Sequence, residues 1–193
     1  MSVINLAILA SGSGTNAEAI IKHFSGHKKI RIAVVLTNNE KAGVIERANR
    51  LHRPCRVFNK IQMAEGSLID VMVEYSIDFV ILAGFLLKIP QYLINAYPER
   101  IVNIHPALLP KYGGKGMYGH HVHEAVIASG DKESGITIHL VNEQYDKGKI
   151  LFQTSCPVLP NDDVDTLASR IHKLEHEHYP KIVEKWVYYT LKA

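Results

Sequence analysis

The chain has 193 residues, 47% of them hydrophobic and 21% charged, which is typical of a packed globular protein and excludes disordered, collagen-like and low-complexity classes. Its length fits a single domain over residues 1–193. The net charge is +3 and the basic residues are scattered, which argues against a nucleic-acid-binding surface.

The first half of the chain alternates short apolar runs, rich in Val and Ile, with helical patterns. This alternation is typical of a parallel sheet with helices on both faces. We expect strands at residues 5–10, 30–37, 55–58, 78–84 and 101–104, and helices at 16–24, 44–51, 67–75 and 90–97. The sequence therefore predicts a doubly wound α/β fold.

The segment Ser-Gly-Ser-Gly-Thr-Asn at residues 11–16 follows the first expected strand and opens the first expected helix. Glycines allow close approach to the backbone, and the N–H groups at a helix start bind anions, so this is a candidate phosphate site. A tight turn capped by Thr15 or Asn16 is the structural alternative. Residues 37–39 lack the acidic group that a dinucleotide site needs there, which disfavours a nicotinamide cofactor.

Asn103 and His105 lie two residues apart in the run Asn-Ile-His-Pro, where Pro106 is expected to end the fifth strand. The period of a strand puts both side chains on one face, at the carboxyl end where doubly wound folds bind ligands. A lone histidine is more often structural. An amide beside an imidazole, however, suits the stabilisation of a developing oxyanion.

A glycine-rich loop at residues 111–119 has a composition typical of a mobile flap beside a site. His120, His121 and His123 follow at the start of a helix expected at 121–129. These histidines are too crowded to predict a metal site, and surface or capping roles are the simpler interpretation.

Apolar side chains alternate with other residues over positions 136–141, which predicts a strand, and a further strand is expected at 150–154. The turn at residues 142–149 is short enough for these strands to pair antiparallel, which makes the sheet mixed. Asp146 lies in this turn, two residues before Gly148. Spacing alone gives Asp146 no more than a role in the turn.

A long helix is expected from Asp163 onward, with Asn161, Asp162 or Asp163 as its cap. Its apolar stripe has a period of about 3.6 residues and comprises Val164, Leu167, Ala168, Ile171, Leu174 and His178. Glu175 falls near the middle of this stripe. Because burial of an unpaired carboxylate is costly, Glu175 is expected to meet a buried partner or a ligand. Pro180 is expected to kink or end the helix.

The longest apolar stretch, residues 79–87, is far shorter than the roughly 20 residues of a membrane span. No basic residue precedes the first apolar run, in contrast to a secretory signal. The spacing of Cys55 and Cys156 does not suggest a zinc site. We therefore expect a cytoplasmic protein with free thiols and no membrane association.

Taken together, these segments resemble the phosphoribosylglycinamide formyltransferase family, the folate-dependent enzymes that formylate glycinamide ribonucleotide in purine synthesis. The resemblance covers nearly the whole chain. It is carried by residues 11–16, 82–85 (Leu-Ala-Gly-Phe), 103–111, 121–123, Asp146 with Gly148, Glu175-His176 and Tyr179-Pro180. It implies a Rossmann-like formyltransferase fold, doubly wound and mostly parallel, with an antiparallel strand pair in the C-terminal half.

The resemblance also implies residue roles. The catalytic trio is Asn103, His105 and Asp146. The substrate phosphate is held by Gly14, Thr15 and Asn16. The ribose hydroxyls are bound by Glu175. The pocket for the co-substrate 10-formyltetrahydrofolate is lined by Leu86, Leu87, Lys88 and Ile89, with Asn103 also touching this donor.

His121 is a candidate accessory residue, and the resemblance implies no metal. The expected partners are the two small-molecule substrates, and the chain is expected to be a monomer or a homodimer. Where many relatives have Met-Arg-Ile, this chain has Leu-Leu-Lys at residues 86–88, and a basic residue that relatives place near Ile61 is missing. The loop at residues 113–119 is also longer and richer in glycine than the Pro-Gly turn of many relatives.

Two related activities and one unrelated class are alternatives. Methionyl-tRNA formyltransferases generally carry an additional C-terminal domain and formyltetrahydrofolate deformylases an additional N-terminal one, and we expect neither domain here. A noncatalytic nucleotide-binding module explains the glycine-rich turn, but it leaves the combination of Asn103, His105, Asp146 and Glu175 unexplained.

Overall fold

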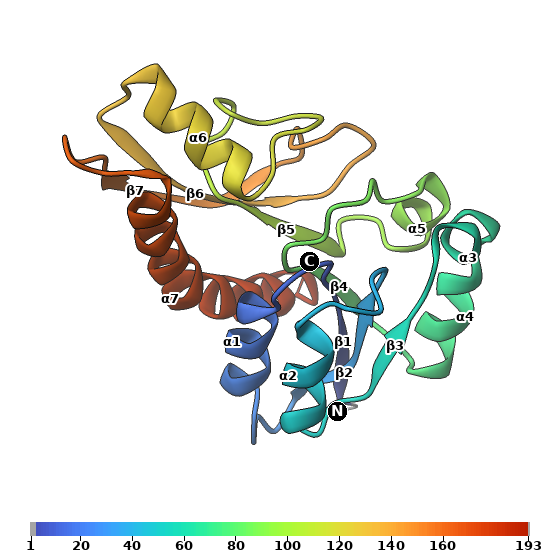
Figure 1. Cartoon of the computed structure of the whole chain (residues 1–193). Helices are drawn as coiled ribbons and strands as arrows, with labels where there is room; N and C mark the ends of the chain where they lie inside the picture. The colour runs from blue at the N-terminus through green and yellow to red at the C-terminus, as the bar shows by residue number, and fades with distance from the viewer. Residues whose placement is uncertain (1–2, 193) are drawn as a thin grey trace. The chain divides into compact units, whose positions relative to one another are not determined.

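A computed structural model describes residues 3–192 of the chain, which divides into two compact units, Met1–Val102 and Asn103–Ala193 (Figure 1). The strand order is β3 (Cys55–Val57), β2 (Ile30–Thr37), β1 (Ile4–Leu9), β4 (Phe79–Leu82), β5 (Ile101–His105), β6 (Glu133–Leu140) and β7 (Ile150–Pro157). Strand β5 (Ile101–His105) begins in the first unit and ends in the second. A mostly parallel sheet with an antiparallel strand pair confirms the predicted fold class.

The first unit is built on the parallel strands β1 (Ile4–Leu9), β2 (Ile30–Thr37), β3 (Cys55–Val57) and β4 (Phe79–Leu82). Strand β1 pairs with β2 and β4, and β2 pairs with β3. Nearly every residue of β1, β2 and β4 is buried, which is why these strands appear in the sequence as continuous apolar runs.

The helices of this unit are α1 (Thr15–His23), α2 (Val44–Arg50), α3 (Lys60–Glu65), α4 (Ser67–Glu74) and α5 (Gln91–Ala96). Helices α1 and α2 contact each other and lie side by side in Figure 1. The sequence pattern misses α3. A capping box begins this helix: Gln62 N–H donates to the Asn59 side chain, and Asn59 N–H donates to the Gln62 side chain.

The second unit contains α6 (His120–Ser129), β6 (Glu133–Leu140), β7 (Ile150–Pro157) and α7 (Val164–Thr190). Strands β6 and β7 pair antiparallel, as predicted, and both extend beyond the predicted bounds. Helix α7, red in Figure 1, packs against β6, β7 and α6.

The sequence predicts that Pro180 kinks or ends this helix; helix α7 continues through Pro180 to Thr190, so the proline does not end it. A proline within a helix costs about 3 kcal/mol. Val183, Trp186 and Val187 are buried beyond it, and their packing offsets this cost. At the other end of the helix, the Asp163 side chain accepts a hydrogen bond from the Thr166 N–H at 2.8 Å, so Asp163 is the cap.

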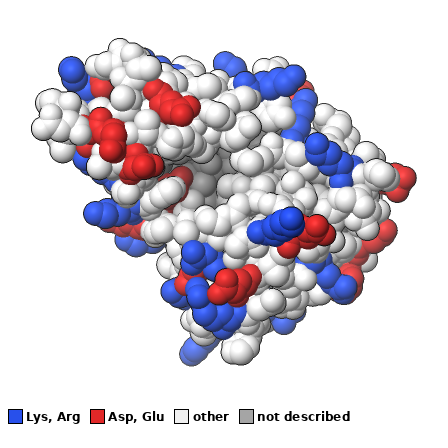
Figure 2. Space-filling view, in the orientation of Figure 1, with Lys and Arg blue, Asp and Glu red and all other residues white. Residues whose placement is uncertain are grey.

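No helix within residues 3–192 combines the length and the apolar character that a membrane span needs. Both thiols, Cys55 and Cys156, are free. The face of the molecule in Figure 2 mixes acidic and basic side chains. Over α1 and α2, for example, Glu18 pairs with three basic residues, Lys22, Arg47 and Arg50.

Candidate active site

Asn103, His105 and Asp146 converge in the second unit, although Asp146 comes from the turn between β6 and β7. Nδ1 of His105 lies 3.7 Å from Oδ2 of Asp146. Nδ2 of Asn103 lies 3.2 Å from Nε2 of His139, which in turn lies 3.5 Å from Oδ1 of Asp146. The structure therefore brings the three predicted residues together around a fourth one, His139.

Strand β5 places the first two of these side chains. The strand ends at His105, as the following Pro106 predicts. Ile104, between them, is buried, while Asn103 is half-buried and His105 is 3% exposed. The two-residue period puts both polar side chains on one face of the strand, where Asn103 meets His139 and His105 faces Asp146, two residues that lie next to each other.

His105 has an acceptor beside each ring nitrogen. Its Nε2 donates a hydrogen bond to the Tyr112 carbonyl oxygen at 2.8 Å, and its Nδ1 faces the Asp146 carboxylate. Burial lowers the pKa of His105 below its ordinary value, although the Asp146 charge and the Tyr112 carbonyl act in the opposite direction. Both acceptors oppose this lowering of the pKa, and a negative charge on a bound substrate would act in the same direction and favour the imidazolium.

Asp146 is a mostly buried carboxylate in the left-handed backbone region, with φ of 55°. Burial raises the pKa of its carboxyl, but His139, the Gly114 N–H and His105 together outweigh burial, and the pKa lies below its ordinary value. The Gly114 N–H donates to Oδ2 at 2.8 Å. At neutral pH, Asp146 is therefore a charged proton acceptor held by the glycine-rich loop.

Gly113 explains how the loop comes so close to this carboxylate. A Cβ at this position would lie 3.3 Å from Cβ of Asp146 and 2.5 Å from Cδ2 of Leu109. A larger residue would require the Leu109 side chain to move and would crowd Asp146.

The sequence interpretation does not assign His139 to the site. It is 2% exposed on β6, and its Nδ1 donates to the Leu140 carbonyl at 2.8 Å. A neutral ring therefore accepts from the Asn103 amide at Nε2, whereas a protonated ring donates to Asp146. One sequence feature points to His139. It lies two residues after Thr137 on an alternating strand, so the two polar side chains share one face of the sheet, and both are buried.

The predicted phosphate segment lies in the first unit, at the start of α1. The N-cap is Gly14, with φ of 78° and no side-chain cap bond, so the alternative of a turn capped by Thr15 or Asn16 is wrong. Arg47 Nε donates to the Ser13 carbonyl at 2.8 Å and holds the loop from α2. A glycine N-cap is suited to an anion because no side chain stands between the ligand and the helix start.

The predicted folate segment at residues 86–89 is in the same unit and is tied to that loop. Ser11 Oγ accepts a bond from the Leu86 N–H at 3.0 Å and donates to Asn38 Oδ1 at 2.6 Å. Leu86 is 48% exposed, whereas Ile89 is buried. Asn38 directly follows β2, at the place where dinucleotide sites have an acidic residue. Here that place holds an amide, which bonds Ser11.

Glu175 is buried on α7, as its place in the apolar stripe predicts. Burial, together with the Glu175 carboxylate, holds the pKa of Tyr179 well above its usual range. The structure thus confirms that a carboxylate points inward from this helix.

The histidines of α6 have different environments. His121 is exposed, and its Nδ1 lies 3.2 Å from Glu124 Oε2. His123 is buried, and burial, followed by the charges of His172, His120 and His105, lowers its pKa to about 4. Within residues 3–192, no group of three or more His, Cys, Asp or Glu side chains is arranged to hold a metal ion.

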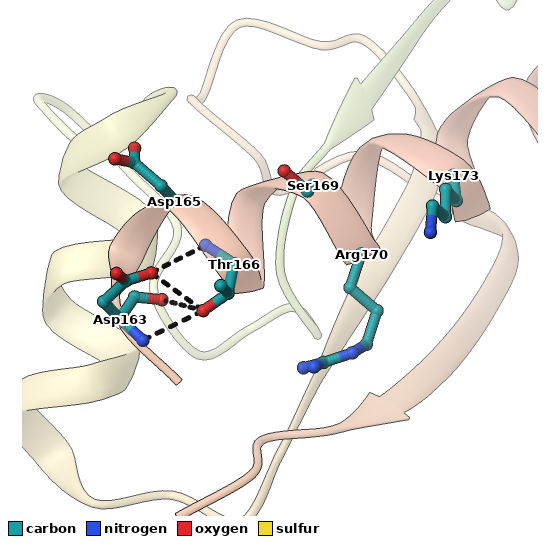
Figure 3. Close-up of a pocket in the computed structure, with 6 residues that line it drawn as sticks. All are labelled: Asp163, Asp165, Thr166, Ser169, Arg170 and Lys173. Carbon is teal, nitrogen blue, oxygen red and sulfur yellow. Dashed lines mark hydrogen bonds between the residues drawn. The ribbon is translucent and has the colours of Figure 1, made fainter. Parts of the chain in front are cut away.

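A hollow of about 390 Å³ lies at the start of α7, apart from these residues. Figure 3 shows the six residues that line it: Asp163, Asp165, Thr166, Ser169, Arg170 and Lys173. The Asp163 carboxylate caps the helix, and Arg170 Nη2 donates to Asp162 Oδ1 at 2.9 Å. Because these charged groups stabilise the helix start, the hollow is not the candidate site.

Comparisons with known proteins identify the family of the chain. Residues 4–183 match the family model described as formyl transferase. A chloroplastic phosphoribosylglycinamide formyltransferase from Arabidopsis thaliana is 43% identical, over 92% of this chain and 63% of the relative. The phosphoribosylglycinamide formyltransferase of Haemophilus influenzae is 34% identical, over 94% of this chain and 85% of the relative.

Solved structures give the same result. The crystal structure of glycinamide ribonucleotide transformylase 1 from Symbiobacterium toebii has a TM-score of 0.86 and 33% identity, covering 94% of this chain and 86% of that chain. The chain therefore spans less than two thirds of the plant relative's length and most of the bacterial ones.

Proposed function

Since the chain belongs to the formyl transferase family, we propose that it transfers the formyl group of 10-formyltetrahydrofolate to the amine of 5-phosphoribosylglycinamide in purine biosynthesis. The convergence of Asn103, His105 and Asp146 is the observation that carries this proposal. Residues 1–193 act as one formyltransferase domain in this proposal. A cytoplasmic location stays a prediction, and the Arabidopsis relative is named as chloroplastic.

In the first step, the substrate amine attacks the formyl carbon. A C–N bond forms, and the electron pair of the C=O double bond moves onto oxygen as an oxyanion. The Asn103 amide and protonated His105 donate hydrogen bonds to this oxygen. Preorganised donors of this kind are each worth about 10²–10³ in rate.

In the second step, the attacking nitrogen loses a proton and the intermediate collapses. Asp146 accepts this proton through water, which its lowered pKa and charge allow. The electron pair on the oxyanion re-forms the C=O bond as the bond from the formyl carbon to N10 of the folate breaks. N10 takes up the proton that Asp146 accepted, returned through water, so Asp146 is again ionised at the end of the reaction. The products are formylated glycinamide ribonucleotide and tetrahydrofolate, with no covalent enzyme intermediate.

The other predicted residues bind the two substrates. Gly14, Thr15 and Asn16 hold the phosphate at the start of α1, and the inward Glu175 accepts hydrogen bonds from the ribose hydroxyls. Residues 86–89 and Asn103 contact the formyl folate, which is a co-substrate. The exposed His121 is an accessory residue in this proposal. The protein acts as a monomer or homodimer on small molecules, with no nucleic acid, membrane or metal required.

The test follows the near-ultraviolet absorbance of 10-formyltetrahydrofolate. We expect a change only when glycinamide ribonucleotide is present. Conversion with water alone would favour a deformylase, and conversion only with methionyl-tRNA would favour the tRNA enzyme. No turnover with any acceptor, together with retained nucleotide binding, would favour the noncatalytic module.

A second measurement tests the phosphate anchor. Charge-assisted hydrogen bonds contribute roughly 1.5–3 kcal/mol each, so the dephosphorylated nucleoside should bind at least about 100-fold more weakly than the nucleotide. Sulfate should compete with the nucleotide and leave folate binding nearly unchanged. Equal binding of nucleoside and nucleotide would remove residues 14–16 from the site.

A further inference from the structure

Tyr112 anchors the start of the glycine-rich loop through its side chain. Its hydroxyl lies 2.6 Å from Ser129 Oγ and donates to Asp131 Oδ2 at 2.8 Å. Ser129 is the last residue of α6 and in turn donates to the Val126 carbonyl. Lys111 Nζ lies 2.9 Å from the same Asp131 oxygen. Two consecutive loop residues are therefore fixed to the end of α6.

The main chain of this anchored segment contacts the trio directly. The Tyr112 carbonyl oxygen accepts from His105 Nε2 at 2.8 Å, and the Gly114 N–H donates to Asp146 at 2.8 Å. Tyr112 has φ of 55°, a left-handed conformation that a residue other than glycine adopts at a cost. The side-chain anchor holds this conformation, and the backbone thus bonds both His105 and Asp146.

The bond to Tyr112 determines which nitrogen of His105 is available for chemistry. A carbonyl oxygen can only accept, so Nε2 carries a proton in both the neutral and the charged ring. Nδ1 lies 3.7 Å from Asp146 Oδ2, beyond hydrogen-bond distance. Nδ1 is thus the nitrogen that can donate to a substrate oxygen once the ring is charged.

On the basis of the proposed function, we propose that Tyr112 is a positioning residue for formyl transfer. Its anchored hydroxyl keeps its carbonyl oxygen on Nε2 of His105 and so assigns Nδ1 to the formyl oxygen. The titratable groups that face the ring are Asp146 from the turn, His139 from β6 and His123 from α6. None of these three groups belongs to Tyr112. Loss of the Tyr112 hydroxyl therefore affects the His105 ring through the hydrogen bond between the ring and the Tyr112 carbonyl oxygen.

The test compares Tyr112→Phe with wild-type protein by ¹⁵N NMR of the histidine rings, in the absence of substrates. In the wild type, neutral His105 should carry its proton on Nε2. In the variant, loss of the anchor should give a mixture of both tautomers and move the His105 titration to lower pH. In turnover assays, kcat should fall about threefold to tenfold, with KM for the ribonucleotide changed less than about twofold.

Tyr118→Phe is the matched control, because Tyr118 is an exposed tyrosine of the same loop. It should leave the His105 tautomer and kcat unchanged. Asp131→Asn weakens the same anchor and should reproduce the Tyr112→Phe spectrum if the first variant fails to fold. The double variant should be no worse than the single ones, because both remove one interaction.

Two outcomes would overturn the proposal: a wild-type His105 with its proton on Nδ1, or an anchor variant with unchanged tautomer and unchanged kcat. The spectra are recorded without substrates. If the wild type shows no formyl transfer while the tautomer responds as expected, the proposed function fails and the role of Tyr112 in orienting His105 stands.

Discussion

Among single residues, Asp146 matters most directly for the proposed proton transfer, because its negative charge accepts the proton. Asp146→Asn keeps the shape of the side chain and an oxygen for the Gly114 N–H. It removes the carboxylate that faces His105 and that accepts the amine proton in the proposed mechanism. We expect kcat at saturating substrates to fall by about 10²-fold or more, while the midpoint of thermal unfolding changes little.

The exposed Glu143 of the same turn provides the control for this substitution. Glu143→Gln also removes one negative charge near the site, and we expect it to leave kcat unchanged. Unchanged turnover in the Asp146→Asn protein would remove Asp146 from the mechanism.

Glu175 tests the nucleotide side of the proposal at the same scale. Glu175→Gln keeps the volume of a buried side chain but removes the charge that, in the proposed function, accepts hydrogen bonds from the ribose. We expect calorimetry to show glycinamide ribonucleotide binding weakened about 10- to 100-fold, with folate binding nearly unchanged. Glu177→Gln, on an exposed position of the same helix, should change neither.

The opposite result has an equally definite interpretation. If Glu175→Gln weakens both ligands equally, or destabilises the fold without affecting either ligand, the carboxylate has a structural partner inside the protein. Its proximity to the buried Tyr179 would then be its main role.

At the scale of the element, helix α1 depends on the left-handed conformation of its N-cap. A Cβ on Gly14 would lie 2.6 Å from the Cα and Cβ of Val44, at φ of 78°. Gly14→Ala should therefore destabilise the protein by about 1–2 kcal/mol or more and weaken sulfate binding, because α2 must move or the loop must change shape. Thermal unfolding with and without sulfate measures both effects.

Gly12→Ala is the control for this change, because a Cβ on Gly12 would meet nothing within 4 Å. It should unfold at nearly the wild-type temperature. If Gly14→Ala were as stable as Gly12→Ala and bound sulfate equally well, the turn would not require its glycine.

The sequence predicts the strands and most helices because buried parallel strands and amphipathic helices have clear periods. Helices α1, α2, α4 and α5 lie within one residue of the expected bounds at each end. Helix α3 is missed, although its Asn59 capping box is visible in the sequence. Its length of 6 residues is not the reason, because α5 is equally short and is predicted. The course of α7 beyond Pro180 depends on tertiary packing, which a local pattern does not contain.

At the scale of the whole molecule, long-range contacts explain what the sequence could not give about the site. Asn103 and His105 are predicted together because a strand fixes their spacing. Asp146 and His139 reach them only through the pairing of β6 with β7 and their position beside β5. Their place follows from the register of the sheet, so only the family resemblance anticipates Asp146, and nothing in the sequence interpretation anticipates His139.

Between about pH 6.5 and pH 4, the pH dependence of stability should be dominated by His123, whose pKa of about 4 lies below the roughly 6.5 of an unfolded chain. The unfolded chain therefore binds the proton first as pH falls. The stability contributed by the neutral ring is complete above about pH 6.5 and is lost progressively toward pH 4. Glu18, with a pKa of about 2, acts only in a more acidic range.

From pH 7.5 to pH 5, the free energy of unfolding should thus fall by about 2 kcal/mol through this one ring. Urea unfolding followed by Trp186 fluorescence measures this change, because Trp186 and His123 belong to the same unit. His123→Phe should flatten the pH dependence, whereas His121→Gln, at an exposed position, should retain it. His105, whose pKa burial also lowers, adds to the slope in the same direction. An equally steep slope in His123→Phe would show that another group carries the effect.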